Sequence, residues 1–346
     1  MERVTIIGLG LIGGSLGMAL NREELSEIEI VGYDEDRKAV SRATKLKAID
    51  RGERDVYHAV RGAQIVIIAT PILAIQQVMK EIGPQLGAGC VVTDTGSTKV
   101  QIMAWADEYL PSSVDFVGGH PMAGKEVSGI ENADPDLFVD ATYCIIPSSR
   151  ASSRAVNLVN GLVERVGAVP FFPSAEEHDG LVAGISHLPL IISSALISAT
   201  ANSASWRELY KLAASGFTDA TRLASSDPVM SADICLTNQE AIRHWIDRLI
   251  AQLEDYKKLI GDGGEELQNS LINSQMARDR WVRGEDVWPE GKEGPEIPTL
   301  GQQLAGMFMG EKLAKRSKQL FDLQMKRMRE AGEVDRDEKR DRKGKE

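Results

Sequence analysis

A histidine in a segment rich in glycine and proline is the residue of this chain best suited to chemistry. His120 lies within Gly118–Glu126, which reads Gly-Gly-His-Pro-Met-Ala-Gly-Lys-Glu and is predicted to be a loop that does not bury the ring in a core. A neutral imidazole accepts the proton of a hydroxyl group while a hydride leaves the same carbon atom. The sequence therefore indicates His120 as a general base, and a loop histidine bonded to backbone is the alternative.

Four further polar residues could act beside this histidine. Ser97 could hydrogen-bond His120 or a cofactor carboxamide, or only cap the following helix. Arg222 could hold a carboxylate with two parallel hydrogen bonds, or form a surface ion pair. Asp179 could cap a helix or reach into a cleft, and His187 lies in an apolar run that is typical of a core histidine. The residue types alone leave each of these alternatives open.

A glycine motif near the start of the chain predicts a dinucleotide site. The predicted strand Val4–Ile7 runs into Gly8-Leu9-Gly10-Leu11-Ile12-Gly13, which has the spacing G-x-G-x-x-G. Gly8 permits a tight turn, Gly10 lets a pyrophosphate approach the backbone, and Gly13 lets the following helix pack closely on the strand. The N-terminus of that helix favours an anion, because its first N–H groups have no partner within the helix.

An acidic residue supports this interpretation and indicates which dinucleotide binds. Asp34 follows the predicted strand Ile28–Tyr33, about 20 residues after the glycine motif, where a carboxylate holds the ribose hydroxyls. A carboxylate at this point repels a 2′-phosphate, so we expect NAD rather than NADP. Arg37 could weaken that preference by binding the 2′-phosphate, which leaves NADP possible.

The elements that must position these residues alternate along the first half of the chain. Short apolar, β-branched runs are predicted as strands at Gln64–Ala69, Cys90–Thr93, Val114–Val117, Thr142–Ile146 and Ala168–Phe172, with helices between them at Ile72–Ile82 and Ser152–Val166. This alternation predicts a Rossmann-type, doubly wound parallel sheet covered on both faces. Ligands bind at the carboxyl ends of such strands, where Thr70, Pro71, Ser97 and His120 follow.

Beyond Pro173 the strand pattern stops and helical periodicity continues. We therefore expect a dinucleotide-binding domain over residues 1–173 and an all-helical domain over 174–330. The charged segment Ala331–Glu346 cannot bury enough apolar surface to order itself and is predicted to be a solvated tail. Gly180–Thr200 is about as long and apolar as a membrane span, but its histidine, proline and serines favour a helix buried in a domain or dimer.

Composition excludes several classes of partner. A net charge of −11 with 42% apolar and 26% charged residues is typical of a globular protein and argues against nucleic acid or an anionic membrane as partner. The three cysteines, Cys90, Cys144 and Cys235, are widely spaced in apolar contexts, as expected for thiols in a reducing cytoplasm. There is no Cys-x-x-Cys pair, so no metal is expected, and the immediate start of a strand predicts no signal peptide.

Taken in order, the motifs resemble those of the prephenate and arogenate dehydrogenases of tyrosine biosynthesis. The resemblance covers roughly residues 3–280 and rests on GLGLIGGS at 8–15, D-x-G-S at 94–97, GGHPMAG-x-E at 118–126, HD at 178–179, SHLP at 186–189 and D-x-x-R-L-A-x-x-D-P at 219–228. It implies a Rossmann domain followed by a helical domain that pairs into a homodimer. It also implies oxidative decarboxylation, in which hydride leaves the substrate ring at C4, CO2 leaves C1 and the ring becomes aromatic.

The resemblance also implies roles for individual residues. His120 would bind the C4 hydroxyl, Ser97 would align histidine and cofactor, and Arg222 would hold a substrate carboxylate. Glu126 and Asp179 would lie at the cleft. His187 would join the substrate-binding group, while the cofactor would be held by Gly8, Gly10, Leu11, Ile12, Gly13, Asp34, Thr70 and Pro71.

Three positions depart from the pattern of many relatives. Leu190 stands in place of a second histidine, Thr218 in place of a basic residue, and Ser231 in place of a tryptophan. All three concern the side-chain end of the substrate, so the choice between prephenate and arogenate stays open. Two other classes are possible, a β-hydroxyacid type of dehydrogenase and a non-catalytic nucleotide sensor. Leu188 and Ile192, where the first class carries lysine and asparagine, argue against it.

Overall fold

The computed structural model describes residues 2–22, 28–125 and 127–285 of the 346. Within these ranges the strands are β1 (Glu2–Ile7), β2 (Ile28–Tyr33), β3 (Arg51–Gly52), β4 (Ile65–Ile68), β5 (Val91–Asp94), β6 (Asp115–Pro121), β7 (Thr142–Pro147) and β8 (Val169–Phe171). The α-helices are α1 (Leu11–Asn21), α2 (Arg37–Lys45), α3 (Val56–Val60), α4 (Ile72–Ile82), α5 (Val100–Tyr109), α6 (Ser153–Arg165), α7 (Ala175–Val182), α8 (Leu188–Ala201), α9 (Trp206–Leu212), α10 (Ser215–Thr221), α11 (Pro228–Thr237), α12 (Gln239–Asp262) and α13 (Glu265–Val282). Single turns lie at η1 (Gly83–Gln85), η2 (Ile130–Asn132), η3 (Ala183–His187, a π-helical turn) and η4 (Arg222–Ser225).

The eight strands form one sheet in the order β3-β2-β1-β4-β5-β6-β7-β8. All neighbours from β3 to β6 are parallel, which confirms the predicted Rossmann-type α/β fold. The prediction of a fully parallel sheet was wrong at one place, because β7 runs antiparallel to β6. A parallel neighbour needs a crossover over one face of the sheet, whereas the described part of the β6–β7 connection contains only the short turn η2.

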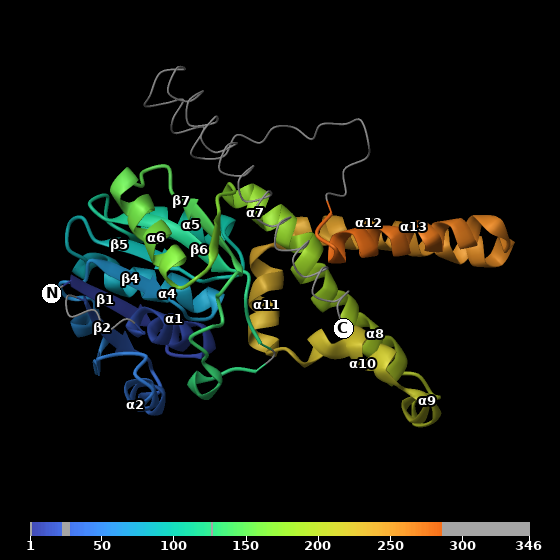
Figure 1. The fold of residues 1–346 in the computed structure, drawn as a ribbon, viewed down its shortest axis with the longest axis horizontal. Coiled ribbons are helices and arrows are strands. Elements are labelled where there is room, and N and C mark those ends of the chain that lie inside the picture. Colours follow the sequence, from blue (N-terminus) through green and yellow to red (C-terminus); the bar gives the residue numbers. More distant parts are fainter. Residues whose placement is uncertain (1, 23–27, 126, 286–346) are drawn as a thin grey trace, which may run out of the picture. The chain divides into compact units, whose positions relative to one another are not determined.

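Helices cover both faces of this sheet (Figure 1). Alternate residues of β4 explain why the strand is wholly apolar: Ile65 and Ile67 pack into a core with α1 and α6, while Val66 and Ile68 pack into a second core with α4 and α5. Each strand residue thus meets a covered face. The polar groups at the strand ends are the ones left available for function.

The glycine motif forms the turn between β1 and α1. Gly8 has a φ of +92°, and a Cβ atom there would lie 2.5 Å from the carbonyl oxygen of Ala69 at the end of β4. Gly13 lets α1 pack closely against the end of β1, because a Cβ atom there would lie only 1.9 Å from the Gly8 carbonyl oxygen. A Cβ atom on Gly10 meets no atom within 4 Å, so this glycine borders open space.

The helical part begins with α7, η3 and α8. A capping box starts α7, where the Ser174 hydroxyl accepts from the Glu177 N–H and the Glu177 carboxylate accepts from the Ser174 N–H. This part joins the sheet through α7 against α5 and α11 against α4. Residues 1–262 form one compact unit, and α13 belongs to a second. The domain boundary at residue 173 therefore stays a prediction, as does the charged tail, which lies outside the described residues.

Among the described residues, one helical stretch, Ala175–Ala201, is long and apolar enough to cross a membrane by length and composition alone. Only 33% of the most apolar 18-residue segment of this stretch is buried inside the chain. The core helix of a globular protein passes the same test. Its predicted burial in a domain or dimer stays a prediction.

We expect Gly13→Ala to lower the free energy of unfolding by about 1–3 kcal/mol, because the added methyl group must force α1 away from β1. Urea unfolding of the full chain measures this change. Gly161→Ala is the matched control: Gly161 lies within α6 with nothing in reach of a Cβ atom, so alanine there should raise stability by about 0.5–1 kcal/mol. Equal effects at the two positions would contradict the close packing of Gly13.

Candidate functional site

His120 lies within a strand, and the prediction of a loop was wrong. It is the sixth residue of β6, pairs with Cys144 of β7 and is 7% exposed. The two glycines before it do not break the strand because they permit a close approach. A Cβ atom on Gly119 would lie 2.5 Å from the carbonyl oxygen of Asp94 on β5. Glycine here brings β6 against the end of β5 and sets the histidine at the carboxyl edge of the sheet.

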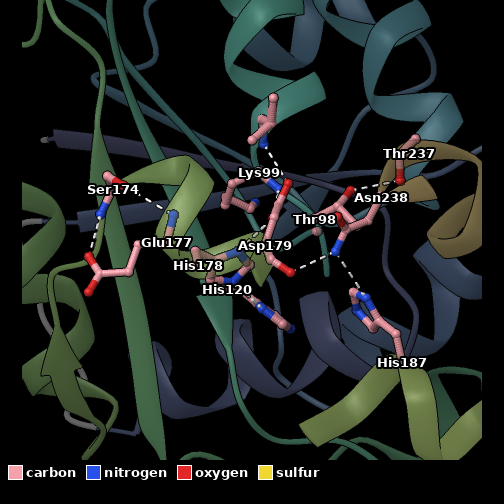
Figure 2. A network of polar contacts seen from close by, with 12 residues as sticks. Thr98, Lys99, His120, Ser174, Glu177, His178, Asp179, His187, Thr237 and Asn238 are labelled. Carbon is pink, nitrogen blue, oxygen red and sulfur yellow. Dashed lines mark hydrogen bonds and ion pairs between the residues drawn. The ribbon is translucent and has the colours of Figure 1, made fainter. Parts of the chain in front are cut away.

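A chain of hydrogen bonds links this histidine to the helical part (Figure 2). His120 Nδ1 lies 2.8 Å from Nε2 of His178 on α7, and His178 Nδ1 lies 2.8 Å from Oδ1 of Asp179. The two rings meet edge to face, with centroids 5.0 Å apart. All three side chains are buried, so water does not compete for these bonds.

Asp179 does not face an open cleft as a substrate ligand would. Its Oδ1 accepts from the N–H of Lys99 at 2.7 Å, and its Oδ2 accepts from the N–H of Val100 at 2.9 Å. These are N–H groups at the start of α5, which lack partners within the helix. The carboxylate therefore caps a helix, as one of the two sequence alternatives proposed, but the helix is α5 and not its own.

A buried ion pair fixes the loop between β5 and α5. The Lys99 ammonium group, which is fully buried, donates to the Asp94 carboxylate and, at 2.7 Å, to the carbonyl oxygen of Gly119. Asp94 also accepts from the N–H groups of Gly96 and Gly119. The pair joins the two strand ends that carry Ser97 and His120.

His187 has one ring nitrogen with a partner and one without. Asn238 donates to the carbonyl oxygen of Asp179 at 2.8 Å, and its side-chain nitrogen lies 3.3 Å from His187 Nδ1 (Figure 2). The Nε2 atom is buried and makes no hydrogen bond of normal length and angle among the described residues, although the backbone of Ser97 lies near enough to this ring to raise its pKa. Since Nδ1 accepts from the amide, the neutral ring carries its proton on Nε2. A buried donor without a partner is costly, and a bound acceptor would satisfy it.

Burial favours the neutral form of both His120 and His187. Desolvation, with the nearby His178, Lys99 and His187, holds the pKa of His120 well below its usual range. Desolvation also lowers the pKa of His187 to about 4, against the opposing effect of Asp179. Neutral imidazoles accept protons, so the arrangement supplies a base at neutral pH.

The β1–α1 turn fits a dinucleotide. Asp34 accepts from the N–H of Leu9 at 2.7 Å, which ties the acidic residue to the glycine loop. Gly10 stands at the N-cap of α1 with no side-chain cap, and its Cβ position opens on free space. Thr70 packs beside Gly8, and Pro71 stands at the N-cap position of α4 without a side-chain cap. An uncapped helix start behind a glycine turn is an anion cradle.

The remaining predicted residues have different positions. Ser97 is half-buried in the loop before α5, where Lys99 holds the N-cap position, and it has no hydrogen bond to His120 among the described residues. Arg222 is exposed where α10 passes into η4. Glu126 lies outside the described residues.

Three residues of this network are not predicted as site residues from the sequence: His178, Lys99 and Asn238. For the lysine a signal existed, because Asp94 and Lys99 flank a tight Gly-Ser turn directly after an apolar strand. Nothing in the local sequence marks Asn238, since its partners come from α7 and η3.

Comparisons with known proteins agree with this geometry. The family model "Prephenate dehydrogenase, nucleotide-binding domain" matches residues 16–171, and "Prephenate dehydrogenase, dimerization domain" matches residues 174–273. The prephenate dehydrogenase of Bacillus subtilis is 36% identical over 80% of this chain and 75% of that protein. The cyclohexadienyl dehydrogenase of Zymomonas mobilis is 31% identical over 83% of this chain and 99% of that protein.

A solved structure shares the fold. The crystal structure of Aquifex aeolicus prephenate dehydrogenase in complex with hydroxyphenyl propionate and NAD+ is 31% identical, with a TM-score of 0.76 over 81% of this chain and 98% of that one.

We expect Lys99→Met to lower the free energy of unfolding by about 3–5 kcal/mol, because it leaves the buried Asp94 carboxylate without its counter-charge. Denaturant unfolding measures the change. Lys125→Met is the matched control, since Lys125 forms an exposed ion pair with Asp134 at 3.1 Å and should cost about 0–1 kcal/mol. A Lys99 variant as stable as the control would show that the buried pair does not hold the loop.

Proposed function

This chain belongs to the prephenate dehydrogenase family, and from that premise we propose that it catalyses the NAD-dependent oxidative decarboxylation of prephenate to 4-hydroxyphenylpyruvate. One observation supports this most: a buried, neutral histidine, His120, stands at the carboxyl edge of a sheet whose β1–α1 turn fits a dinucleotide. Aromatisation with loss of CO2 supplies the driving force. The protein's task is then to align its ligands and to hold one proton.

His120 accepts the proton of the C4 hydroxyl group while hydride leaves C4. The carboxylate at C1 leaves as CO2, and its bonding electrons complete the aromatic ring. The C4 oxygen then takes the proton back, so the base ends as it began. Burial supports this role, since a low pKa keeps the imidazole unprotonated before the reaction.

The bound cofactor, NAD+, supplies the hydride acceptor. The residues proposed to hold it are Gly8, Gly10, Leu11, Ile12 and Gly13 around the pyrophosphate, Asp34 at the ribose, and Thr70 and Pro71 at the end of β4. The Asp34 carboxylate, already fixed on the Leu9 N–H, disfavours a 2′-phosphate and so favours NAD over NADP.

The proposed substrate-binding residues are Arg222, Glu126 and His187, with Ser97 aligning histidine and cofactor. His187 offers its buried Nε2–H as a donor to the bound ligand. Arogenate, or both substrates, is the alternative supported by the cyclohexadienyl dehydrogenase relative. Leu190, buried where many relatives have a second histidine, leaves that choice to measurement.

The assembly proposed is a homodimer formed by the helical part over residues 174–330, with the nucleotide domain over 1–173. Exposed apolar side chains on that part, such as Leu181, Ile185 and Leu236, supply a surface for a second copy. A cytoplasmic location is proposed because the three cysteines are free thiols. The partners proposed are a small molecule and a second copy, not nucleic acid or membrane.

The direct test is turnover with prephenate and arogenate, each with NAD+ and NADP+. We expect activity with prephenate and a preference for NAD+. His120→Asn should lower kcat by about 10²- to 10⁴-fold, the range for a positioned base, and leave NAD+ binding unchanged. The wild-type kcat/KM should fall only below about pH 6.5, the ordinary histidine value, because burial lowers the pKa of His120. Normal turnover by the variant would remove His120 from the mechanism.

Arg222→Ala should raise the KM for prephenate about 30-fold, which corresponds to the lower end of the cost of removing one partner of a desolvated charge pair. Initial rates at saturating NAD+ give this value. Arg222→Lys should recover part of the loss, because an ammonium group cannot reproduce two parallel hydrogen bonds. Arg150→Ala is the control, since Arg150 forms an exposed ion pair with Asp107. Equal KM values for the two alanine variants would place the anion clamp elsewhere.

A further inference from the structure

We propose that His178 and Asp179 are positioning residues that fix the imidazole tautomer of His120, so that Nδ1 carries the proton and the Nε2 lone pair faces the ligand. The inference rests on the function proposed above and adds two residues to its machinery. Neither residue touches the reacting atoms: His178 acts through His120, and Asp179 acts through His178.

The direction of the hydrogen bonds follows from the far end of the chain. An ionised carboxylate only accepts, so the Asp179 oxygen requires a proton on His178 Nδ1. A neutral imidazole then has a lone pair on Nε2, and this atom requires a proton on His120 Nδ1 at 2.8 Å. Nε2 of His120 is left as the acceptor. Without this chain, either nitrogen of His120 could carry the proton.

The carboxylate is fixed in its place. It sits at the N-terminus of α5, where two N–H groups donate to it and the helix dipole favours a negative charge. A capping box fixes the start of α7, which carries both residues. At the other end of the chain, Lys99 binds the carbonyl oxygen of Gly119, the neighbour of His120. Both rings are thus fixed on elements that cannot rotate independently.

The charges around His120 explain why the pair is needed. Burial disfavours the imidazolium ion most, and a positive charge on His178 of α7, on Lys99 at the start of α5 or on His187 of η3 would disfavour it further. On β7, Cys144 and Tyr143 stay neutral, because burial raises the pKa of both groups. The Lys99 charge is already met by Asp94 on β5.

This leaves Asp179 as the negative group joined to His120 through hydrogen bonds. When Nε2 of His120 takes the hydroxyl proton, the Nδ1 proton can shift toward His178 Nε2 and the positive charge toward Asp179. The shift reverses when the C4 oxygen takes its proton back, so no net proton is gained.

The tautomer can be measured without turnover. Nitrogen-15 NMR of the histidine side chains, with His120 assigned by its absence in His120→Asn, should show at neutral pH a protonated Nδ1 and an unprotonated Nε2. A proton on His120 Nε2 would overturn the proposal, because it would mean that His178 donates on both sides. The NMR measurement tests the tautomer even if neither prephenate nor arogenate is a substrate. Absence of turnover would contradict only the proposed function.

Kinetics of variants test the consequence for the base. His178→Leu should lower kcat about tenfold or more, a fraction of the effect of losing the base itself, with little change in the KM for prephenate. His178→Gln should recover part of the loss, because its amide oxygen can accept from His120 Nδ1. His58→Gln is the control, since the His58 side chain is exposed and forms its hydrogen bond with Asp55, three residues before it. Wild-type kcat in both His178 variants would overturn the proposal.

Asp179→Asn separates an electrostatic role from a structural one. Asparagine also caps helices, but its one acceptor oxygen replaces only one of the two bonds to the start of α5, so the unfolding temperature is measured beside kcat. Loss of the negative charge should move the acid limb of the kcat/KM profile to lower pH and reduce kcat, because the imidazolium ion is stabilised less. A lowered kcat with an unmoved limb, in a variant that unfolds at the wild-type temperature and binds NAD+ normally, would show that Asp179 only shapes the loop and would overturn its part in the proposal.

Discussion

The site depends on one carboxylate at the start of one helix. Asp179 comes from α7, yet its oxygens accept from the first N–H groups of α5, so a buried charge joins the helical part to the end of the sheet that carries His120. Burying a carboxylate is unfavourable unless several donors surround it. Here two backbone N–H groups and an imidazole do so. The same bonds that make the charge tolerable also set the position of His178 and therefore of His120.

A buried ion pair performs the corresponding task within the sheet. Asp94 and Lys99 tie the end of β5 to Gly119 on β6, and glycine allows the two strand ends to approach closely. The result is a rigid edge in which the strands, the β5–α5 loop and α7 share hydrogen bonds. Rigid support matters for a catalytic base, because a small displacement of a reacting group lowers the reaction rate strongly.

Polar groups in this edge fall into two classes. Those of Asp94, Lys99, His178 and Asp179 have their hydrogen bonds within the protein. The Nε2–H of His187 and the uncapped start of α1 have no such partner among the described residues. Buried donors without partners are rare in proteins. Their place near His120 and the glycine turn is what a site for two ligands requires, one anionic cofactor and one oxygen-rich substrate.

The sequence by itself determined the periodic and local features. Wholly apolar strands, the glycine turn with Asp34, and the change to helices after Pro173 follow from side-chain spacing, because each is an interaction between near neighbours. The predicted bounds of β2 and α4 agree with the observed ones. The motifs also identified the family, since they occur in the right order.

Only the tertiary structure decided how distant residues meet. Gly118, Gly119 and Pro121 suggested a loop around His120, but pairing with β7 makes this segment a strand, because strand pairing overrides local preference. The partners of Asp179 lie 79 and 80 positions away and those of His120 lie 58 away, separations that no local pattern records. A helix cap supplied by another helix leaves no mark in either segment. The sequence therefore singled out His120, whereas its burial and its contact with His178 were decided by packing.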